Sequence, residues 1–113
     1  KAPAFQFYAS DFDSATRSWL PEEVGVYIRL LSSQWITGPL PIDLRRLSLI
    51  AGVSKDEIEI IWETVGPKFI KTPDGFINER LEKIRQDQFE FRERQSQAGR
   101  KGAEKRWGNK NEK

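Results

Sequence analysis

Apolar residues recur at helical spacing in the stretch of the chain that follows Pro21. Glu22 and Glu23 come directly after this proline, and acidic residues in a first helical turn face the positive end of the helix dipole. The apolar positions that follow are Val24, Tyr27, Ile28, Leu31 and Trp35. Because residues three, four and seven apart share one helix face, this stripe predicts an amphipathic helix, which Gly38-Pro39 ends.

Two shorter helical patterns come next. The first runs from Asp43 to Ala51, and Gly52 is its expected C-terminal cap. The second begins at Ser54, where Ser54 and Glu57 have the spacing of a capping box that satisfies free backbone N–H groups. Its apolar face consists of Ile58, Ile61, Trp62 and Val65. Two short helices joined by a Gly-containing turn predict a helix-turn-helix.

Short β-prone runs surround the turn residues Pro73-Asp74-Gly75 and predict a hairpin from residue 68 to residue 77. Phe5–Tyr8 is a further aromatic run, expected as an edge strand that could pair with the hairpin, because isolated hairpins are marginal in water. Residues 10–18 are expected as a polar connection between this strand and the first helix. The fold predicted for residues 1–78 is a winged helix-turn-helix, mainly α (α+β), with a small β-wing.

A long charged helix is expected over residues 79–97, with Asn78 as its N-cap, because this stretch contains neither Gly nor Pro. Its heptad-spaced positions are Leu81, Ile84, Gln88, Phe91, Gln95 and Ala98. The first part of this seam is expected to pack on the domain, and the distal part is a candidate homodimer contact. Residues 98–113 contain three glycines among basic residues, so they are expected to form a flexible tail.

Charge is unevenly distributed, although the net charge of the chain is only +2. Residues 1–78 carry eight Lys/Arg and ten Asp/Glu, whereas residues 98–113 carry six and two. An affinity for a polyanion is therefore expected in the tail rather than in the globular part.

The absence of Cys and His removes disulfides, thiolate zinc sites, cysteine nucleophiles and the usual neutral-pH general base. The carboxylate pairs Asp11/Asp13 and Glu22/Glu23 are better explained by capping and solubility than by catalysis. No apolar run reaches the roughly 18 residues that a membrane span requires, and no signal peptide opens the chain. We therefore expect a cytoplasmic protein that is not an enzyme and has no cofactor, metal site or membrane association.

The chain resembles the YdaU-like domain family of phages and prophages over nearly its whole length. The residues that carry the resemblance are Phe7-Tyr8, Asp11-Phe12, Glu23, Gly25, Tyr27, Arg29, Leu30, Leu31, Trp35, Gly38 to Pro41, Leu47, Ala51-Gly52, Asn78, Arg80-Leu81, Ala98 to Ala103 and Arg106-Trp107. The resemblance implies a winged-helix fold, an origin in mobile elements and an association with replication initiation. It implies no catalytic residue.

The tail combines cationic residues with one aromatic ring, Trp107, which suits phosphate contact and base stacking. The helix that begins after Ser54 is acidic, which disfavours its insertion into a DNA groove because phosphates repel carboxylates. The candidate nucleic-acid contacts are Lys71, Arg92, Arg94, Arg100, Lys101, Lys105, Arg106, Trp107 and Lys110.

The expected function is that of a DNA-associated accessory protein of phage-type replication initiation, which binds duplex or single-stranded DNA mainly through the tail and distal helix, helped by the wing. One alternative is a protein-interaction module that self-associates or recruits a replication protein, such as a helicase or its loader. The other alternative, a transcriptional regulator, needs base readout, which the acidic helix disfavours.

Overall fold

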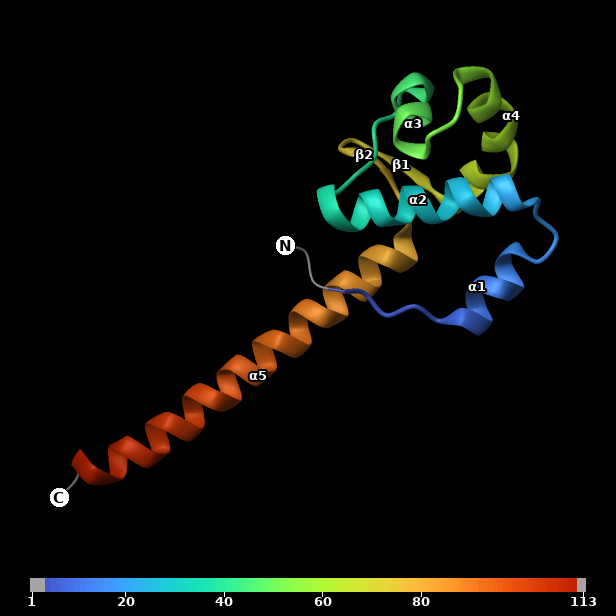
Figure 1. Ribbon diagram of the computed structural model, residues 1–113. Coiled ribbons are helices and arrows are strands. Elements are labelled where there is room, and N and C mark those ends of the chain that lie inside the picture. Colours follow the sequence, from blue (N-terminus) through green and yellow to red (C-terminus); the bar gives the residue numbers. More distant parts are fainter. Residues whose placement is uncertain (1–3, 112–113) are drawn as a thin grey trace.

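A computed structural model describes the backbone of residues 4–111 and the side chains of residues 4–99. The elements in order are α1 (Ala9–Thr16), α2 (Pro21–Thr37), α3 (Leu44–Ala51), α4 (Lys55–Val65), the 3-10 turn η1 (Gly66–Lys68), β1 (Ile70–Thr72), β2 (Gly75–Ile77) and α5 (Glu79–Asn111). Helices α2 to α4 and the hairpin form a head from which α5 projects (Figure 1), and the extents of the molecule are 74 × 30 × 22 Å. The expected mainly helical chain, small antiparallel sheet and long C-terminal helix are confirmed.

Helix α2 is the central element of the head, contacted by α3, by α4 and by the start of α5. Its buried residues are Val26, Tyr27, Leu30, Leu31, Gln34 and Trp35. The predicted stripe missed Val26 and Leu30 and included Val24 and Ile28, which are only half-buried. Because α2 is covered from more than one side, its buried face is wider than a single stripe.

Helices α3 and α4 begin and end where the local signals place them. The Asp43 side chain accepts a hydrogen bond from the Arg45 N–H at 3.0 Å, and Gly52 caps α3 in the left-handed conformation. Ser54 and Glu57 form the predicted capping box, with both hydrogen bonds at 3.1 Å. The apolar face of α4 is buried at Ile58, Ile61 and Val65 and half-buried at Trp62.

Strands β1 and β2 pair antiparallel as expected, with Ile70 opposite Ile77. The third backbone partner of this sheet is Leu40, which exchanges two hydrogen bonds of 2.8 Å with Phe76. Gly75 lies opposite Thr72 at a φ of 133°, and a Cβ there would overlap the Leu40 carbonyl oxygen. The close approach of Leu40 to the hairpin therefore requires a glycine at position 75.

The predicted edge strand at Phe5–Tyr8 is wrong, because these residues form no regular structure and no backbone pairing with the hairpin. The segment is held by its aromatic side chains instead, and the Phe5 ring packs 5.2 Å from the Trp35 ring. The predicted polar connection is also wrong in part, since Ala9–Thr16 forms α1. Phe12 gives α1 an apolar contact with the head, where its ring stacks 5.6 Å from the Tyr27 ring.

Helix α5 begins as expected, with the Asn78 side chain accepting a hydrogen bond from the Leu81 N–H at 2.9 Å. It continues to Asn111, so the predicted end at residue 97 is wrong. Each glycine costs a helix about 1 kcal/mol, but the residues between Gly99, Gly102 and Gly108 are mostly strong helix formers such as Ala, Arg, Lys and Glu. None of the helices in the described part of the chain is long and apolar enough to cross a membrane.

Candidate nucleic-acid interface

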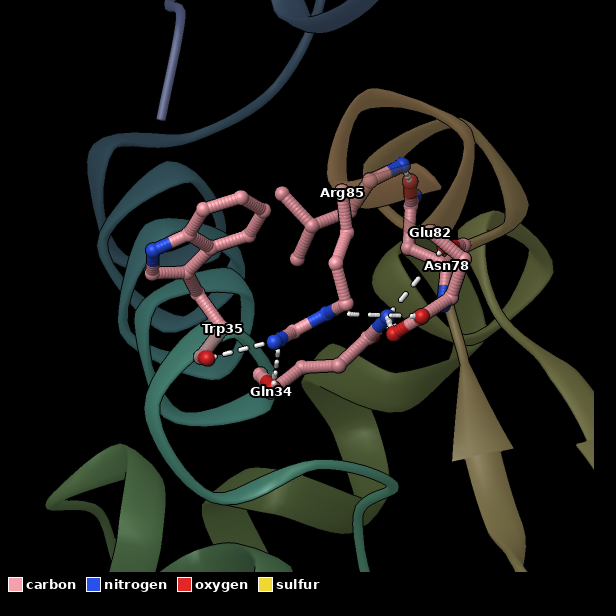
Figure 2. A network of polar contacts seen from close by, with 6 residues as sticks. Gln34, Trp35, Asn78, Glu82 and Arg85 are labelled. Atoms are coloured by element: carbon pink, nitrogen blue, oxygen red, sulfur yellow. Dashed lines mark hydrogen bonds and ion pairs between the residues drawn. The ribbon is translucent and has the colours of Figure 1, made fainter. Parts of the chain in front are cut away.

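A buried amide joins α2 to the start of α5. Gln34 is fully buried; its Oε1 accepts a hydrogen bond from the Asn78 N–H at 2.7 Å, and its Nε2 donates to the Glu82 side chain at 2.9 Å (Figure 2). Gln34 was not predicted as a functional residue, although it lies four residues after Leu30 and therefore on an apolar face of α2. A single amide at an apolar helical position is the feature of the sequence that could have indicated a buried hydrogen-bonded side chain.

Arg85 attaches α5 to the C-terminal end of α2. Its guanidinium donates hydrogen bonds to the carbonyl oxygens of Gln34 at 3.0 Å and Trp35 at 2.6 Å (Figure 2). The same guanidinium lies 4.5 Å from the centroid of the Trp35 ring. The Gln34 carbonyl also accepts a hydrogen bond from the Gly38 N–H at 2.8 Å. The carbonyl groups of a last helical turn carry the negative end of the helix dipole, so a cation is stabilising there.

Asn78 extends this network to the hairpin side of the head. Its side-chain amide donates to the Lys68 carbonyl at 2.9 Å and to the Tyr27 hydroxyl at 3.3 Å. Burial raises the pKa of the Tyr27 hydroxyl, which therefore stays protonated. The network fixes α5 on the head, so the direction of α5 is set by buried contacts.

A groove of about 580 Å³ runs along α5 beyond this anchor, and we call it the α5 groove. It is lined by Gln6 and Tyr8 of the N-terminal segment and by residues of α5 from Ile84 to Gln95. The Gln88 side chain donates a hydrogen bond to the Ala4 carbonyl at 3.0 Å and so ties the N-terminal segment to α5. The groove thus lies between two segments far apart in the sequence.

Two of the predicted nucleic-acid contacts, Arg92 and Arg94, line the α5 groove. Among the residues whose side chains are described, neither arginine has an ion pair or hydrogen bond. The same groove exposes the rings of Tyr8 and Phe91, which are 49% and 53% accessible. The structure therefore combines two available cations with two accessible aromatic rings.

Lys71, the predicted contact in the wing, is exposed on β1 and pairs in register with Phe76. It belongs to the head, whereas Arg92 and Arg94 lie along the projecting α5 (Figure 1). The remaining candidates are outside the residues whose side chains are described. These are Arg100, Lys101, Lys105, Arg106, Trp107 and Lys110.

The exposed face of α4 carries the acidic residues Asp56, Glu57, Glu59 and Glu63. The hydrogen bond from the Ser54 backbone N–H holds the pKa of the Glu57 carboxyl below its usual value, so Glu57 is charged at neutral pH. Two apolar side chains are also exposed on the neighbouring helices: Leu49 of α3 is 77% accessible and Ile60 of α4 is 71% accessible. The carboxylates of this face repel phosphates.

The described residues contain no group of His, Cys, Asp and Glu side chains suited to a metal ion. A family model described as a protein of unknown function (DUF1376) matches residues 3–86 of the chain. No curated protein and no solved structure matches it. The matched region includes the head and the anchor residue Arg85, and it ends before Phe91, Arg92 and Arg94.

Proposed function

The chain belongs to the DUF1376 family, whose function is unknown, and we propose that it is a DNA-associated accessory protein of phage-type replication initiation. This role is the one implied by the resemblance to the YdaU-like family. We propose that DNA is bound mainly by the distal part of α5 and the basic residues at its end.

The proposed head is a winged helix-turn-helix. Support comes from the order of α2, α3, α4 and the hairpin. Leu40, which lies between α2 and α3 in the sequence, also pairs with Phe76 of the hairpin. The hairpin follows directly on α4 and η1, as a wing follows the second helix of such a motif. In this proposal the head holds α5 in position and does not itself read DNA, because fold alone does not fix function.

The observation that carries the proposal is the separation of charge along a continuous helix. Residues 1–78 carry ten acidic and eight basic residues, and residues 98–113 carry six basic and two acidic ones. Helix α5 joins the two parts without a break and has 33 residues, so it is about 50 Å long at 1.5 Å per residue. A polyanion is thus attracted to the end of α5 that is most distant from the acidic head.

The acidic face of α4 argues against the usual position of a second helix in the major groove. Asp56 and Glu57 lie in the first turn of α4, where a recognition helix contacts base edges. Sequence-independent affinity for DNA comes mainly from neutralised phosphates, and carboxylates oppose it. A role in transcriptional regulation would need base readout by this helix and is therefore less well supported.

Binding of fluorescent single-stranded and duplex oligonucleotides over a salt series tests the proposal. Deletion of residues 98–113 removes six cations, and the slope of log affinity against log salt for single strands should become shallower by up to about 4. The control is the pair Arg45→Gln and Arg46→Gln, which removes two exposed cations from the head. Binding that survives the deletion but is lost in the control would contradict the proposal.

Recruitment of a replication protein, such as a helicase or its loader, is the second candidate function. The exposure of Leu49 and Ile60 on α3 and α4 favours it, because these are the most accessible large apolar side chains of the described residues and exposed apolar surface can contact a protein. Leu49→Gln with Ile60→Gln should then abolish partner capture while leaving oligonucleotide affinity unchanged. If DNA binding were the only function, the two substitutions would change neither partner capture nor oligonucleotide affinity.

A further inference from the structure

The α5 groove has the size and composition of a site for part of a nucleic-acid strand. Its volume of about 580 Å³ falls in the usual range of about 300–1,000 Å³ for ligand sites. Tyr8 from the N-terminal segment and Phe91 from α5 supply aromatic surface, and Gln95 supplies an amide that can hydrogen-bond base edges. The Gln6 Oε1 already accepts a hydrogen bond from the Tyr8 hydroxyl at 2.6 Å. An accessible ring can stack with any base, whatever its identity.

The charges of the groove favour a strand with phosphates over a neutral ligand. Arg92 and Arg94 have no ionic partner among the described side chains, and Asp87 is the one acidic residue that lines the groove. The net charge of the residues that line the groove is therefore +1. Arginine also suits this role because its planar guanidinium binds phosphate in a bidentate manner and stacks on bases.

The wall that carries Tyr8 is held in place before any ligand binds. The Arg80 guanidinium lies 5.7 Å from the centroid of the Tyr8 ring and forms an ion pair with Asp11. On the other side, Gln88 holds the Ala4 carbonyl at 3.0 Å. Because these contacts already order the segment, a ligand loses less free energy to ordering it.

From these observations we propose that the α5 groove binds single-stranded nucleic acid, with a base stacked on Tyr8 and Phe91 and the neighbouring phosphates on Arg92 and Arg94. Single strands are favoured because duplex bases hide their faces within the helical stack. The proposal rests on the proposed function and makes it specific, since it names the strand type and a stacking site.

The groove is continuous with the basic end of the chain. It ends at Gln95, and the backbone of α5 continues through residues 100–110 without a break. At 1.5 Å per residue, positions 94 and 106 of one helix lie about 18 Å apart along its axis. A strand that leaves the groove along α5 therefore passes the part of the chain with the largest positive excess.

The test measures binding of the full chain to an oligothymidine of about 12 nucleotides and to the same strand with abasic sites, which keeps the phosphates and removes the bases. Tyr8→Leu and Phe91→Leu should each weaken oligothymidine binding by roughly 5- to 100-fold and leave the affinity for the abasic strand unchanged. Phe89→Leu is the matched control, because Phe89 is 59% accessible on α5 and does not line the groove.

Equal affinities of the parent for the oligothymidine and the abasic strand would overturn the stacking site, as would an equal loss in Phe89→Leu. A second copy of the chain is the other possible occupant of the groove. If Phe91→Leu lowers the mass in sedimentation while oligothymidine affinity stays the same, the groove is a dimer contact and the proposal is wrong. The salt slope of the tail deletion tests the proposed function separately, because it depends on cations rather than on Tyr8 and Phe91.

Discussion

Arg85 binds Trp35 twice, with its guanidinium 4.5 Å from the centroid of the indole ring and a hydrogen bond of 2.6 Å to the Trp35 carbonyl oxygen. The two residues belong to α5 and α2, so this contact joins the projecting helix to the centre of the head. A third contact, to the Gln34 carbonyl, makes Arg85 a C-terminal cap for α2 that another helix supplies.

Replacement of Arg85 should therefore weaken the fold. Arg85→Gln removes the cation from the C-terminal end of α2 and the contact with the Trp35 ring, and the free energy of unfolding should fall by about 1–2 kcal/mol. Urea denaturation measures it. Arg92→Gln is the control, because Arg92 is exposed and should change stability by less than about 0.5 kcal/mol. Equal effects of the two substitutions would contradict the assigned role of Arg85.

Gln34 should tolerate an apolar replacement poorly, although it occupies a buried position. Gln34→Leu keeps similar volume but leaves the buried Asn78 N–H without its acceptor, while the Glu82 side chain loses one contact and keeps its ion pair with Arg85. An unsatisfied buried donor costs about 1–3 kcal/mol, so the thermal midpoint should drop by several degrees. Gln86→Leu, at an exposed position of α5, provides the comparison. A Gln34→Leu variant as stable as the parent would show that the network is dispensable.

Two glycines should respond to alanine in opposite directions. Gly75→Ala puts a methyl group against the Leu40 carbonyl and requires a φ of 133°, so it should destabilise the head by about 2 kcal/mol or more. Gly25 lies inside α2, and a Cβ there would meet no atom within 4 Å. Gly25→Ala should therefore stabilise the protein by about 0.5–1 kcal/mol. Calorimetry of both variants checks the pair, and a destabilised Gly25→Ala would contradict the helix geometry.

The cap of α4 should make stability depend on pH in the acid range. The hydrogen bonds from Ser54 lower the pKa of Glu57 in the folded state below its ordinary value of 4.5. A carboxyl with a lowered folded pKa contributes stability above the unfolded pKa, and this contribution is lost as the pH falls through the folded pKa. The difference in unfolding free energy between the parent and Glu57→Gln should therefore be largest near neutral pH and shrink below about pH 4.5. Parallel pH curves for the two proteins would rule out this contribution.

Elements set by neighbouring residues could be predicted from the sequence. The cap at Ser54, the glycine at position 52 and the turn at 73–75 act within a few residues of themselves, and the structure places α3, α4 and the hairpin accordingly. The start of α5 at Asn78 is a signal of the same kind.

Features that depend on distant residues could not be predicted. Leu40 pairs with Phe76 through a single backbone bridge, which leaves no β-prone run to detect, whereas the aromatic run at Phe5–Tyr8 suggested a strand but serves packing. Gln34 and Asn78 are 44 positions apart in the sequence, so no local pattern around either residue predicts their contact. The α5 groove was missed for the same reason: Arg92 and Arg94 were expected to bind nucleic acid, but their closeness to Tyr8 depends on how the N-terminal segment lies.

Asn78 precedes the first turn of α5 and Arg85 lies two turns later, and both are bound to α2. These two contacts also prevent α5 from rotating about its own axis. Each residue of an α-helix advances by about 100° around that axis. One residue inserted after Arg85 would leave the contacts of Asn78 and Arg85 intact and rotate every later side chain of α5 by about 100° around the helix axis. The phase of the helix, as much as its length, therefore decides which side chains meet the N-terminal segment.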